Sequence, residues 1–204
     1  MPEKVALITG AARGIGLETA RLFIEQGWRV ALVDRDSEAL KDSTDGLNET
    51  SSFICDISEP KEVDSMVNKV TSTFGRIDAV VNNAGVADFG PIETTDFAQW
   101  RKIMQTNLDG TFLVSQACLP TLKKTRGAIV NIASISGLRA STLRVAYGTS
   151  KAAVIQLTKQ QAVELGEIGV RANCVCPGPV RTKLSNAVHS PEIIASYHDA
   201  IPLN

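Results

Sequence analysis

Short apolar runs alternate along this chain with longer stretches in which apolar residues recur at helical spacing. The first run, residues 4–9, is apolar almost throughout, which is typical of a strand buried on both faces of a parallel sheet. Five later runs resemble it, and we expect strands at residues 28–33, 51–55, 78–81, 127–133 and 170–176. The intervening spacing predicts helices after Gly16, at residues 36–47, 59–74 and 96–119, from Tyr147 through Leu165, and briefly at 191–197.

Strands that alternate with helices in this way predict a parallel sheet with right-handed crossovers. We therefore expect one domain over residues 1–204, of the α/β class, with a Rossmann-type doubly wound sheet and the strand order 3-2-1-4-5-6. No internal repeat, low-complexity tract or linker interrupts the pattern. Ligands of such sheets bind at the carboxyl ends of the strands, so the residues that follow each strand are the first candidates for function.

Composition and charge narrow the classes of function. The net charge is −1 and both signs are spread along the chain, so nothing predicts a nucleic-acid or polybasic membrane surface. The apolar runs are too short to cross a bilayer, and the N-terminus lacks the architecture of a signal peptide. The four cysteines show no C-x-x-C spacing, so we expect neither a disulfide framework nor a metal site, and a reducing, cytoplasmic location.

Three glycines follow the first strand with the spacing G-x-x-x-G-x-G, at Gly10, Gly14 and Gly16, and a helical pattern begins beside them. A strand, a glycine-rich turn and a helix N-terminus together hold phosphate groups, because the backbone approaches closely and its N–H groups are free. A tight connection between strand and helix would use the same residues. The spacing also differs from the usual G-x-G-x-x-G fingerprint of dinucleotide sites.

Acidic residues stand at the ends of the second and third strands. Asp34 lies about 20 residues past the glycines, where a carboxylate accepts hydrogen bonds from an adenosine ribose and repels a 2′-phosphate. This favours NAD over NADP, although Arg13 and Arg35 would reach a 2′-phosphate if they are not simply surface charges. Asp56 is placed either to meet an adenine amino group or to form a turn or helix cap.

The strongest candidate chemistry lies on the predicted helix that carries Tyr147 and Lys151. Residues four apart share a helix face, and a nearby ammonium favours the phenolate and pulls the pKa of the phenol toward neutrality. The pair can then exchange a proton with a carbonyl or alcohol oxygen. Ser134 follows the fifth strand, shortly before this helix.

Two groups of amides remain open at this point. Asn107 is a polar residue in the middle of a predicted helix, where it satisfies a local backbone group or bends the helix and binds a water. The segment Asn82-Asn83-Ala84-Gly85 follows the fourth strand and suits either the joining of neighbouring strands or contact with a cofactor.

Taken together and in order, these motifs closely resemble the short-chain dehydrogenase/reductase family, in its classical, NAD-preferring branch. The resemblance covers the whole chain and implies a catalytic tetrad of Asn107, Ser134, Tyr147 and Lys151. It also implies a set of cofactor-binding residues: Gly10, Arg13, Gly14, Ile15, Gly16, Asp34, Arg35, Asp56, Ile57, Asn83, Ala84, Gly85, Tyr147, Lys151, Pro177, Gly178, Val180 and Thr182.

The resemblance also implies a role for each tetrad residue. Tyr147 is the acid–base residue for the substrate oxygen, and Lys151 lowers its pKa and binds the nicotinamide ribose. Ser134 holds the substrate oxygen and stabilises its developing charge. Asn107 holds a water that connects Lys151 to solvent. The implied reaction is an NAD-dependent exchange of hydride with a small secondary alcohol or ketone.

Two other functions stay open, as do the substrate and the assembly. The chain is also compatible with an NADP-dependent 3-oxoacyl-carrier-protein reductase, and less so with a non-catalytic dinucleotide-binding sensor. Loops at residues 86–89, 138–145 and 181–197 are expected to select the substrate. The substrate-loop region proper is expected at about residues 183–200, and His189 and His198 are expected on the surface. Family members usually continue into a last helix and a seventh strand that are absent here, and they form homodimers or homotetramers.

Overall fold

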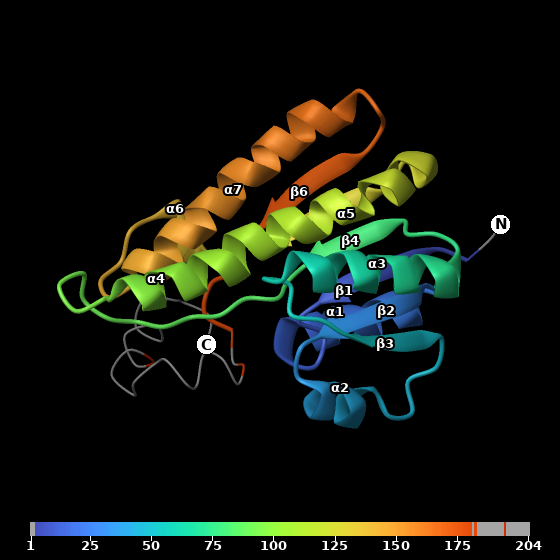
Figure 1. Cartoon of the computed structure of the whole chain (residues 1–204), viewed down its shortest axis with the longest axis horizontal. Helices are drawn as coiled ribbons and strands as arrows, with labels where there is room; N and C mark the ends of the chain where they lie inside the picture. The colour runs from blue at the N-terminus through green and yellow to red at the C-terminus, as the bar shows by residue number, and fades with distance from the viewer. Residues whose placement is uncertain (1–2, 181, 183–193, 195–204) are drawn as a thin grey trace.

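Six parallel strands form one sheet in the order β3-β2-β1-β4-β5-β6, which confirms the predicted topology. The structure, a computed structural model, describes residues 3–180, 182 and 194, and Figure 1 shows the sheet between its helices. The strands are β1 (Val5–Thr9), β2 (Arg29–Asp34), β3 (Thr50–Ile54), β4 (Ala79–Asn82), β5 (Ala128–Ile132) and β6 (Arg171–Val175). The predicted substrate loop, the short helix at 191–197 and both histidines fall mainly in residues 183–193 and 195–200, which lie outside the described residues.

Helices cover both faces of this sheet. Helices α1 (Gly14–Glu25) and α2 (Ser37–Thr44) lie on one face, and α3 (Pro60–Phe74), α5 (Gly110–Thr125) and α7 (Val145–Gly166) lie on the other (Figure 1). Each face has its own apolar core, and all five residues of β1 are buried between the two. The central strand is therefore apolar on both sides, as the continuous run at residues 4–9 predicted. No helix of the described residues is both long and apolar enough to cross a membrane.

The predicted helix at residues 96–119 is helical throughout but is not uniform. It consists of α4 (Phe97–Met104), a π-helical turn η1 (Gln105–Asp109) and α5. Asn107 lies in the π turn, and such turns inside helices are frequent at functional sites. The sequence did not predict the short helix α6 (Ile135–Leu138), which follows β5.

Parallel register brings the carboxyl ends of all six strands to one edge of the sheet. Thr9 pairs with Val33, and Asn82 at the end of β4 pairs with Asn131 in β5. The glycine turn, the acidic residues and the catalytic candidates all follow strand ends, so the topology alone gathers them on this edge.

A buried network of amides and hydroxyls crosses the sheet below that edge. Asn82 donates through Nδ2 to Asn131 Oδ1 at 2.8 Å, and Asn131 donates through its own Nδ2 to Thr158 Oγ1 and Gln161 Oε1, each also at 2.8 Å. Asn131 has no exposed surface. The network therefore joins β4 and β5 to α7 by bonds that water cannot replace.

We predict that Asn131→Ala lowers the free energy of unfolding by about 2–4 kcal/mol, because each of three buried partners loses one hydrogen bond. Denaturant unfolding followed by circular dichroism measures this loss. Asn173→Ala is the matched control, since Asn173 lies in the adjacent strand β6 but is exposed. We expect its effect to stay within about 0.5 kcal/mol. Equal losses in the two variants would contradict the structural role of the network.

Candidate active site

The glycine turn between β1 and α1 forms one wall of a groove at the carboxyl edge of the sheet. Gly10 and Gly14 have φ values of +66° and +58°, which residues other than glycine rarely adopt. A Cβ atom at Gly16 would lie 2.2 Å from the carbonyl oxygen of Gly10 and 2.6 Å from Asn83 Nδ2. The turn is therefore packed tightly enough that only glycine fits, as expected where a helix N-terminus must come close to a phosphate.

Thr9 and Asn83 fix this turn to the neighbouring strand β4. Thr9 Oγ1 accepts from the backbone N–H groups of Asn83 and Ala84 at 3.1 and 3.0 Å. Asn83 Nδ2 donates to the carbonyl oxygens of Thr9 and Gly10 at 3.0 and 3.1 Å. We call this set of bonds the Thr9–Asn83 junction. It gives Asn83 the strand-joining role, one of the two that the sequence left open.

The groove beyond the turn is lined by most of the residues predicted to bind a cofactor. It runs past the ends of β1, β2, β3 and β4, and its predicted members are Gly10, Arg13, Gly14, Ile15, Asp34, Arg35, Asp56, Ile57, Asn83, Ala84, Gly85 and Thr182. Gly16 is buried beneath the turn instead of lining the groove.

Asp34 is oriented by the backbone around it. Its carboxylate accepts from the N–H groups of Ala12 and Asp36 at 3.1 and 3.0 Å, so it stands at the rim of the groove between the glycine turn and α2. The two arginines nearby are each engaged with an acid. Arg13 pairs with Asp36, and Arg35 pairs with Asp56 at 3.3 Å.

Asp56 forms the turn that the sequence offered as one alternative. Its Oδ1 accepts from the backbone N–H of Ser58 at 3.0 Å and from its hydroxyl at 2.7 Å. Partial burial opposes ionisation, but these bonds and the Arg35 guanidinium hold the pKa of Asp56 below its ordinary value. The carboxylate is therefore an acceptor on the groove wall.

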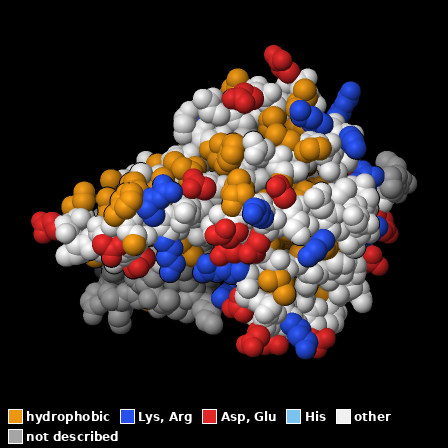
Figure 2. Space-filling view, in the orientation of Figure 1, with side chains coloured by type: hydrophobic (Ala, Val, Ile, Leu, Met, Phe, Trp, Pro, Cys, Tyr) orange, Lys and Arg blue, Asp and Glu red, His pale blue; other side chains and the backbone are white. Residues whose placement is uncertain are grey.

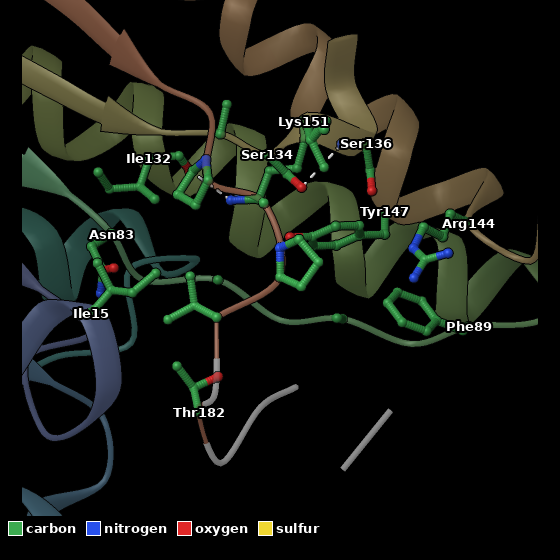
Figure 3. A pocket seen from close by; sticks show the side chains of 18 residues that line it. Ile15, Asn83, Phe89, Ile132, Ser134, Ser136, Arg144, Tyr147, Lys151 and Thr182 are labelled. Carbon is green, nitrogen blue, oxygen red and sulfur yellow. Dashed lines mark hydrogen bonds between the residues drawn. The ribbon is translucent and has the colours of Figure 1, made fainter. Parts of the chain in front are cut away.

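A second cavity adjoins the groove and contains the catalytic candidates. It shares Ile15, Asn83, Gly85 and Thr182 with the groove. Ser134, Tyr147 and Lys151 line it, as do the predicted residues Pro177, Gly178 and Val180. Figure 3 shows Ile15, Asn83 and Thr182 toward one end, Phe89 and Arg144 toward the other, and Tyr147 between them. Groove and cavity together can hold an elongated ligand with a small second molecule beside it.

Tyr147 and Ser134 approach this cavity from different elements. Tyr147 is in the first turn of α7, and its ring packs edge-on against Phe89 with a centroid distance of 5.7 Å. Ser134 caps α6, and its hydroxyl oxygen accepts from the N–H of Ser136 at 3.1 Å (Figure 3). Because that bond uses a lone pair and not the hydroxyl proton, the proton of Ser134 can be donated to a bound oxygen atom.

Lys151 is a buried cation one turn along α7 from Tyr147. Only 5% of its surface is exposed, its Nζ donates to the carbonyl oxygen of Ile132 at 2.8 Å, and it lies 5.9 Å from the Tyr147 ring centroid (Figure 3). Burial lowers the pKa of Lys151 to about 8, against the opposing effect of the Cys174 and Cys176 thiols nearby.

Asn107 does not line the cavity but supports its walls. Its Oδ1 accepts from Val86 N at 2.8 Å, and its Nδ2 donates to Val86 O and to Ser150 Oγ, each at 3.0 Å. Ser150 in turn donates to the carbonyl oxygen of Tyr147 at 2.7 Å. The π turn thus presents one amide to both the loop after β4 and the first turns of α7. The sequence offered a local backbone group as one partner for Asn107, whereas the backbone that it binds is that of Val86, 21 residues away.

Comparison with known families shows which family this chain belongs to. The family model described as short chain dehydrogenase matches residues 4–192. The chain belongs to the short-chain dehydrogenase family. It is an oxidoreductase of the type that acts on alcohols with a nicotinamide dinucleotide.

Several named relatives share this short-chain dehydrogenase framework. The chain is 40% identical to meso-2,3-butanediol dehydrogenase of Serratia marcescens over 185 residues, which cover 90% of the chain and 74% of that enzyme. It is 36% identical to L-fucose dehydrogenase of Oryctolagus cuniculus, with 89% and 64% covered. It is 35% identical to 2-(S)-hydroxypropyl-CoM dehydrogenase 3 of Xanthobacter autotrophicus, with 96% and 80% covered.

Solved structures agree with the fold of this short-chain dehydrogenase. A 3-ketoacyl-(acyl-carrier-protein) reductase from Brucella melitensis, complexed with NADH, superimposes with a TM-score of 0.93 at 29% identity, covering 100% of the chain and 85% of the reductase. The Pseudomonas aeruginosa RhlG/NADP active-site complex gives a TM-score of 0.91 at 29% identity, covering 98% and 82%. One neighbour was solved with NADH and the other with NADP, so they support the cofactor class and not the choice between its two forms.

Sequence reasoning missed several residues of the site. It assigned no role to the hydroxyls of Thr9 and Ser150, each of which bonds a residue far along the chain. Phe89 was included only within a loop, and its packing against Tyr147 was not predicted. The one available signal was that Thr9 is a polar residue at the end of an otherwise apolar strand.

The buried charge of Lys151 predicts an unusual dependence of stability on pH. The pKa is about 8 in the folded chain against 10.5 for an unperturbed lysine. The folded state therefore binds fewer protons than the unfolded state between these values, so the destabilisation is complete below about pH 8 and lessens as pH rises. From about pH 8 to about pH 9.5, we expect the free energy of unfolding to rise by about 1.5 kcal/mol relative to Lys151→Met.

Urea unfolding of the cofactor-free proteins at several pH values measures this difference. Lys159→Met is the matched control, because Lys159 lies on the same helix and is exposed. The difference between wild type and this control should stay constant with pH. A constant difference for Lys151→Met as well would show that the ammonium is not held in a desolvating site.

Proposed function

We propose that this short-chain dehydrogenase binds NAD along the groove and exchanges hydride with the carbon of a secondary alcohol or ketone in the adjoining cavity. The observation that carries the proposal is that Ser134, Tyr147 and Lys151 line one cavity that continues into the groove bearing Asp34. NAD supplies the hydride acceptor, and NADH the donor in the reverse direction. The tightly packed glycine turn and the strand-end acids fit a dinucleotide, with its pyrophosphate at the N-terminus of α1.

In this proposal, Tyr147 takes the hydroxyl proton of the alcohol, or returns it to the ketone. The Lys151 ammonium stabilises the phenolate that makes this possible, since it lies in a site where water does not screen its charge. Ser134 donates its hydroxyl proton to the substrate oxygen and stabilises the negative charge that develops there. Tyr147 and Ser134 thus act on the substrate oxygen itself, and Lys151 acts on it through Tyr147.

The proton must then leave the half-buried phenol of Tyr147. Asn107 Oδ1 and Lys151 Nζ lie on the same side of Gly85, at 3.2 and 3.5 Å from where a Cβ of that glycine would be. We propose that a water bound by Asn107 accepts the proton by way of Lys151 and passes it toward solvent. The amide is held by Val86 and Ser150, which would keep such a water in a constant position.

We predict that Tyr147→Phe lowers kcat for alcohol oxidation by about 10³-fold or more while the affinity for NADH stays within about twofold, because only the hydroxyl that carries the transferable proton is removed. The ring contact with Phe89 is preserved in this variant. Turnover is measured by NADH absorbance and affinity by NADH fluorescence. Full turnover in the variant would refute the assignment of Tyr147. Phe89→Leu is a control that changes the apolar contact and leaves the hydroxyl.

NAD is the cofactor that the groove favours. Asp34 would accept hydrogen bonds from the adenosine ribose and repel a phosphate on it. Arg13 and Arg35 are each paired with an acid, which weakens the attraction that either would offer to a 2′-phosphate. The alternative is an NADP-dependent 3-oxoacyl-carrier-protein reductase. The similarity to a 3-ketoacyl reductase supports its substrate, but that structure contains NADH and does not support NADP.

The ratio of kcat/KM for NAD to that for NADP tests this choice. We predict a ratio well above one in the wild type, and a decrease of about tenfold or more in Asp34→Asn, since a like charge near a phosphate costs more than about 1.4 kcal/mol at the protein surface. Asp42→Asn makes the same change of charge at an exposed site on α2 and should leave the ratio unchanged. A wild-type preference for NADP would favour the reductase alternative.

The names of the relatives indicate only a broad class of substrate. Those named above act, by their names, on a butanediol, on L-fucose and on a hydroxypropyl thioether of CoM, each of which carries a hydroxyl group. A first screen should therefore offer these compounds, hydroxysteroids and 3-hydroxyacyl thioesters with NAD. If NAD binds and none of a broad range of alcohols is oxidised, the third alternative, a non-catalytic sensor, gains support.

We also propose that the chain forms a homodimer or homotetramer and works in the cytoplasm. Figure 2 shows hydrophobic side chains on the surface over α4, α5 and α7, and Phe97, Phe112 and Val163 are exposed by 76%, 45% and 75%. Covering such residues favours association. All four cysteines are free thiols, which suits a reducing compartment.

A further inference from the structure

Two cysteines lie together near Lys151 and have no part in the proposed reaction. Cys174 is in β6, where it pairs with Asn131 of β5, and Cys176 follows the end of that strand. Residues two apart in an extended chain point to the same side, and here that side faces α7, because Asn131 bonds residues of α7. The two sulfur atoms are 3.9 Å apart. The chain therefore holds a pair of adjacent thiols and not two isolated cysteines.

This pair differs from the other two cysteines of the chain. Cys55 and Cys118 are buried, with 2% and 0% of their surface exposed, and burial is the main cause that raises the pKa of each thiol to about 12. Cys174 and Cys176 are only partly buried among the described residues, so a small oxidant can reach them. Burial and the nearby Cys176 sulfur raise the pKa of Cys174, which keeps this thiol protonated. Cys176 is therefore the better nucleophile of the pair.

The segment that contains Cys176 forms part of the active-site wall. Pro177 and Gly178 follow directly and line the cavity that holds Ser134. The N–H of Ile135, next to Ser134, donates to the carbonyl oxygen of Pro177 at 3.0 Å. A movement of Cys176 therefore acts on this hydrogen bond and on the cavity wall together.

From this arrangement we propose that Cys174 and Cys176 form a reversible disulfide when the protein meets a hydroperoxide, and that the disulfide lowers the affinity for the dinucleotide. All four cysteines are free thiols in the structure, so the disulfide is a second, oxidised form of the chain. In a reducing compartment disulfides occur mostly as transient bonds of this kind. The inference goes beyond the proposed function, because the bond forms without substrate or hydride transfer.

The bond forms in two steps. The thiolate of Cys176 attacks one peroxide oxygen, which breaks the O–O bond, gives the sulfenic acid of Cys176 and releases hydroxide or an alkoxide. The sulfur of Cys174 then attacks the sulfur of Cys176, and the displaced oxygen leaves as water with the thiol proton of Cys174. The two thiols together lose two electrons, and the peroxide gains them.

Closure of the disulfide must move the backbone beyond β6. The sulfur atoms have to approach from 3.9 Å to about 2.05 Å. Two residues of an extended chain span about 6.6–7.2 Å between Cα atoms, at the upper end of the range for disulfides, so the chain has to bend. Cys174 is held by its pairing with β5, whereas Cys176 lies past the last residue of β6. The bend therefore displaces Cys176 and Pro177, on the wall near which the nicotinamide would lie.

Peptide mass spectrometry and cofactor titration of the intact protein test this proposal. The protein is treated with a small excess of hydrogen peroxide, catalase removes the remainder, and iodoacetamide in denaturant blocks the free thiols. Trypsin then releases residues 172–181, a peptide that contains both cysteines. We expect this peptide to have lost two hydrogen atoms and to escape alkylation, whereas Cys55 and Cys118 are alkylated.

A separate portion of the treated protein is titrated with NADH and with NADPH, and binding is followed by fluorescence. We expect the affinity for the dinucleotide to decrease by about fivefold or more after peroxide and to recover with dithiothreitol.

Three variants separate the disulfide from other effects of peroxide. In Cys174→Ser the sulfenic acid of Cys176 has no partner and should be trapped by dimedone. Cys176→Ser should form no disulfide, and its affinity before and after peroxide should agree within about twofold. Cys118→Ala changes a buried cysteine and should respond to peroxide as the wild type does.

Three results would each overturn the proposal. The first is a wild-type peptide that remains a dithiol after peroxide. The second is a disulfide that leaves the affinity for the dinucleotide unchanged. The third is an equal loss of affinity in Cys176→Ser, which would place the sensitive group elsewhere. The first measurement needs no turnover, so it stands apart from any failure of the proposed alcohol oxidation.

Discussion

The Thr9–Asn83 junction is the interaction on which the rest of the site depends. It consists of a buried threonine hydroxyl, two backbone N–H groups and one amide side chain, and it joins the ends of β1 and β4. Strand β1 leads into the glycine turn, whereas β4 leads into the segment that passes Gly85, Val86 and Phe89 on its way to the substrate cavity. The two binding regions therefore have a fixed relative position before any ligand arrives. Such preorganisation is what transfer between two bound molecules requires.

The segment after β4 connects the cofactor side of the site to the substrate side and is itself fixed by hydrogen bonds and ring contacts. Asn107 holds it at Val86 and also binds Ser150, which is bonded to the backbone of Tyr147. Farther along, Phe89 contacts the Tyr147 ring and lies beneath the Arg144 guanidinium. A π turn places one more residue in the helix than an α turn would. That extra residue allows one asparagine to face a loop and a neighbouring helix at once. The helical irregularity thus coincides with the residue that joins the loop after β4 to α7.

The sequence predicted what depends on local pattern and missed what depends on long-range contact. Apolar runs were enough for the strand order, because a parallel sheet with right-handed crossovers has few topologies. Asp34, Asn83 and Ser134 were found because each lies at or just past the end of a strand, and strand ends meet at one edge. By contrast, the π turn contains Asn107, whose bond to Val86 spans 21 residues, and no helical periodicity encodes such a contact. Thr9 was read as the end of a strand, since its partners lie more than 70 residues away. The pairing of Arg13 with Asp36 was also not predicted, because the two residues are 23 positions apart in sequence. Without it, the sequence could not show that Arg13 is engaged with an acid near Asp34.

Burial of the Lys151 ammonium lowers the stability of the fold at a position where the charge can act on Tyr147. A lysine that is 5% exposed would be more stable in water, and its lowered pKa of about 8 reflects that preference. The fold compensates the ammonium with a hydrogen bond from its Nζ to the carbonyl oxygen of Ile132, and glycines line the segments packed nearby. A Cβ at Gly85 would lie 3.5 Å from Nζ, and one at Gly137 would lie 2.6 Å from the Lys151 backbone. Close packing of α6 on α7 and of the loop on Asn107 therefore sets both the depth of the charge and its position beside Tyr147. A solvated lysine at the same point would be more stable and less effective, because water would screen the field that favours the phenolate.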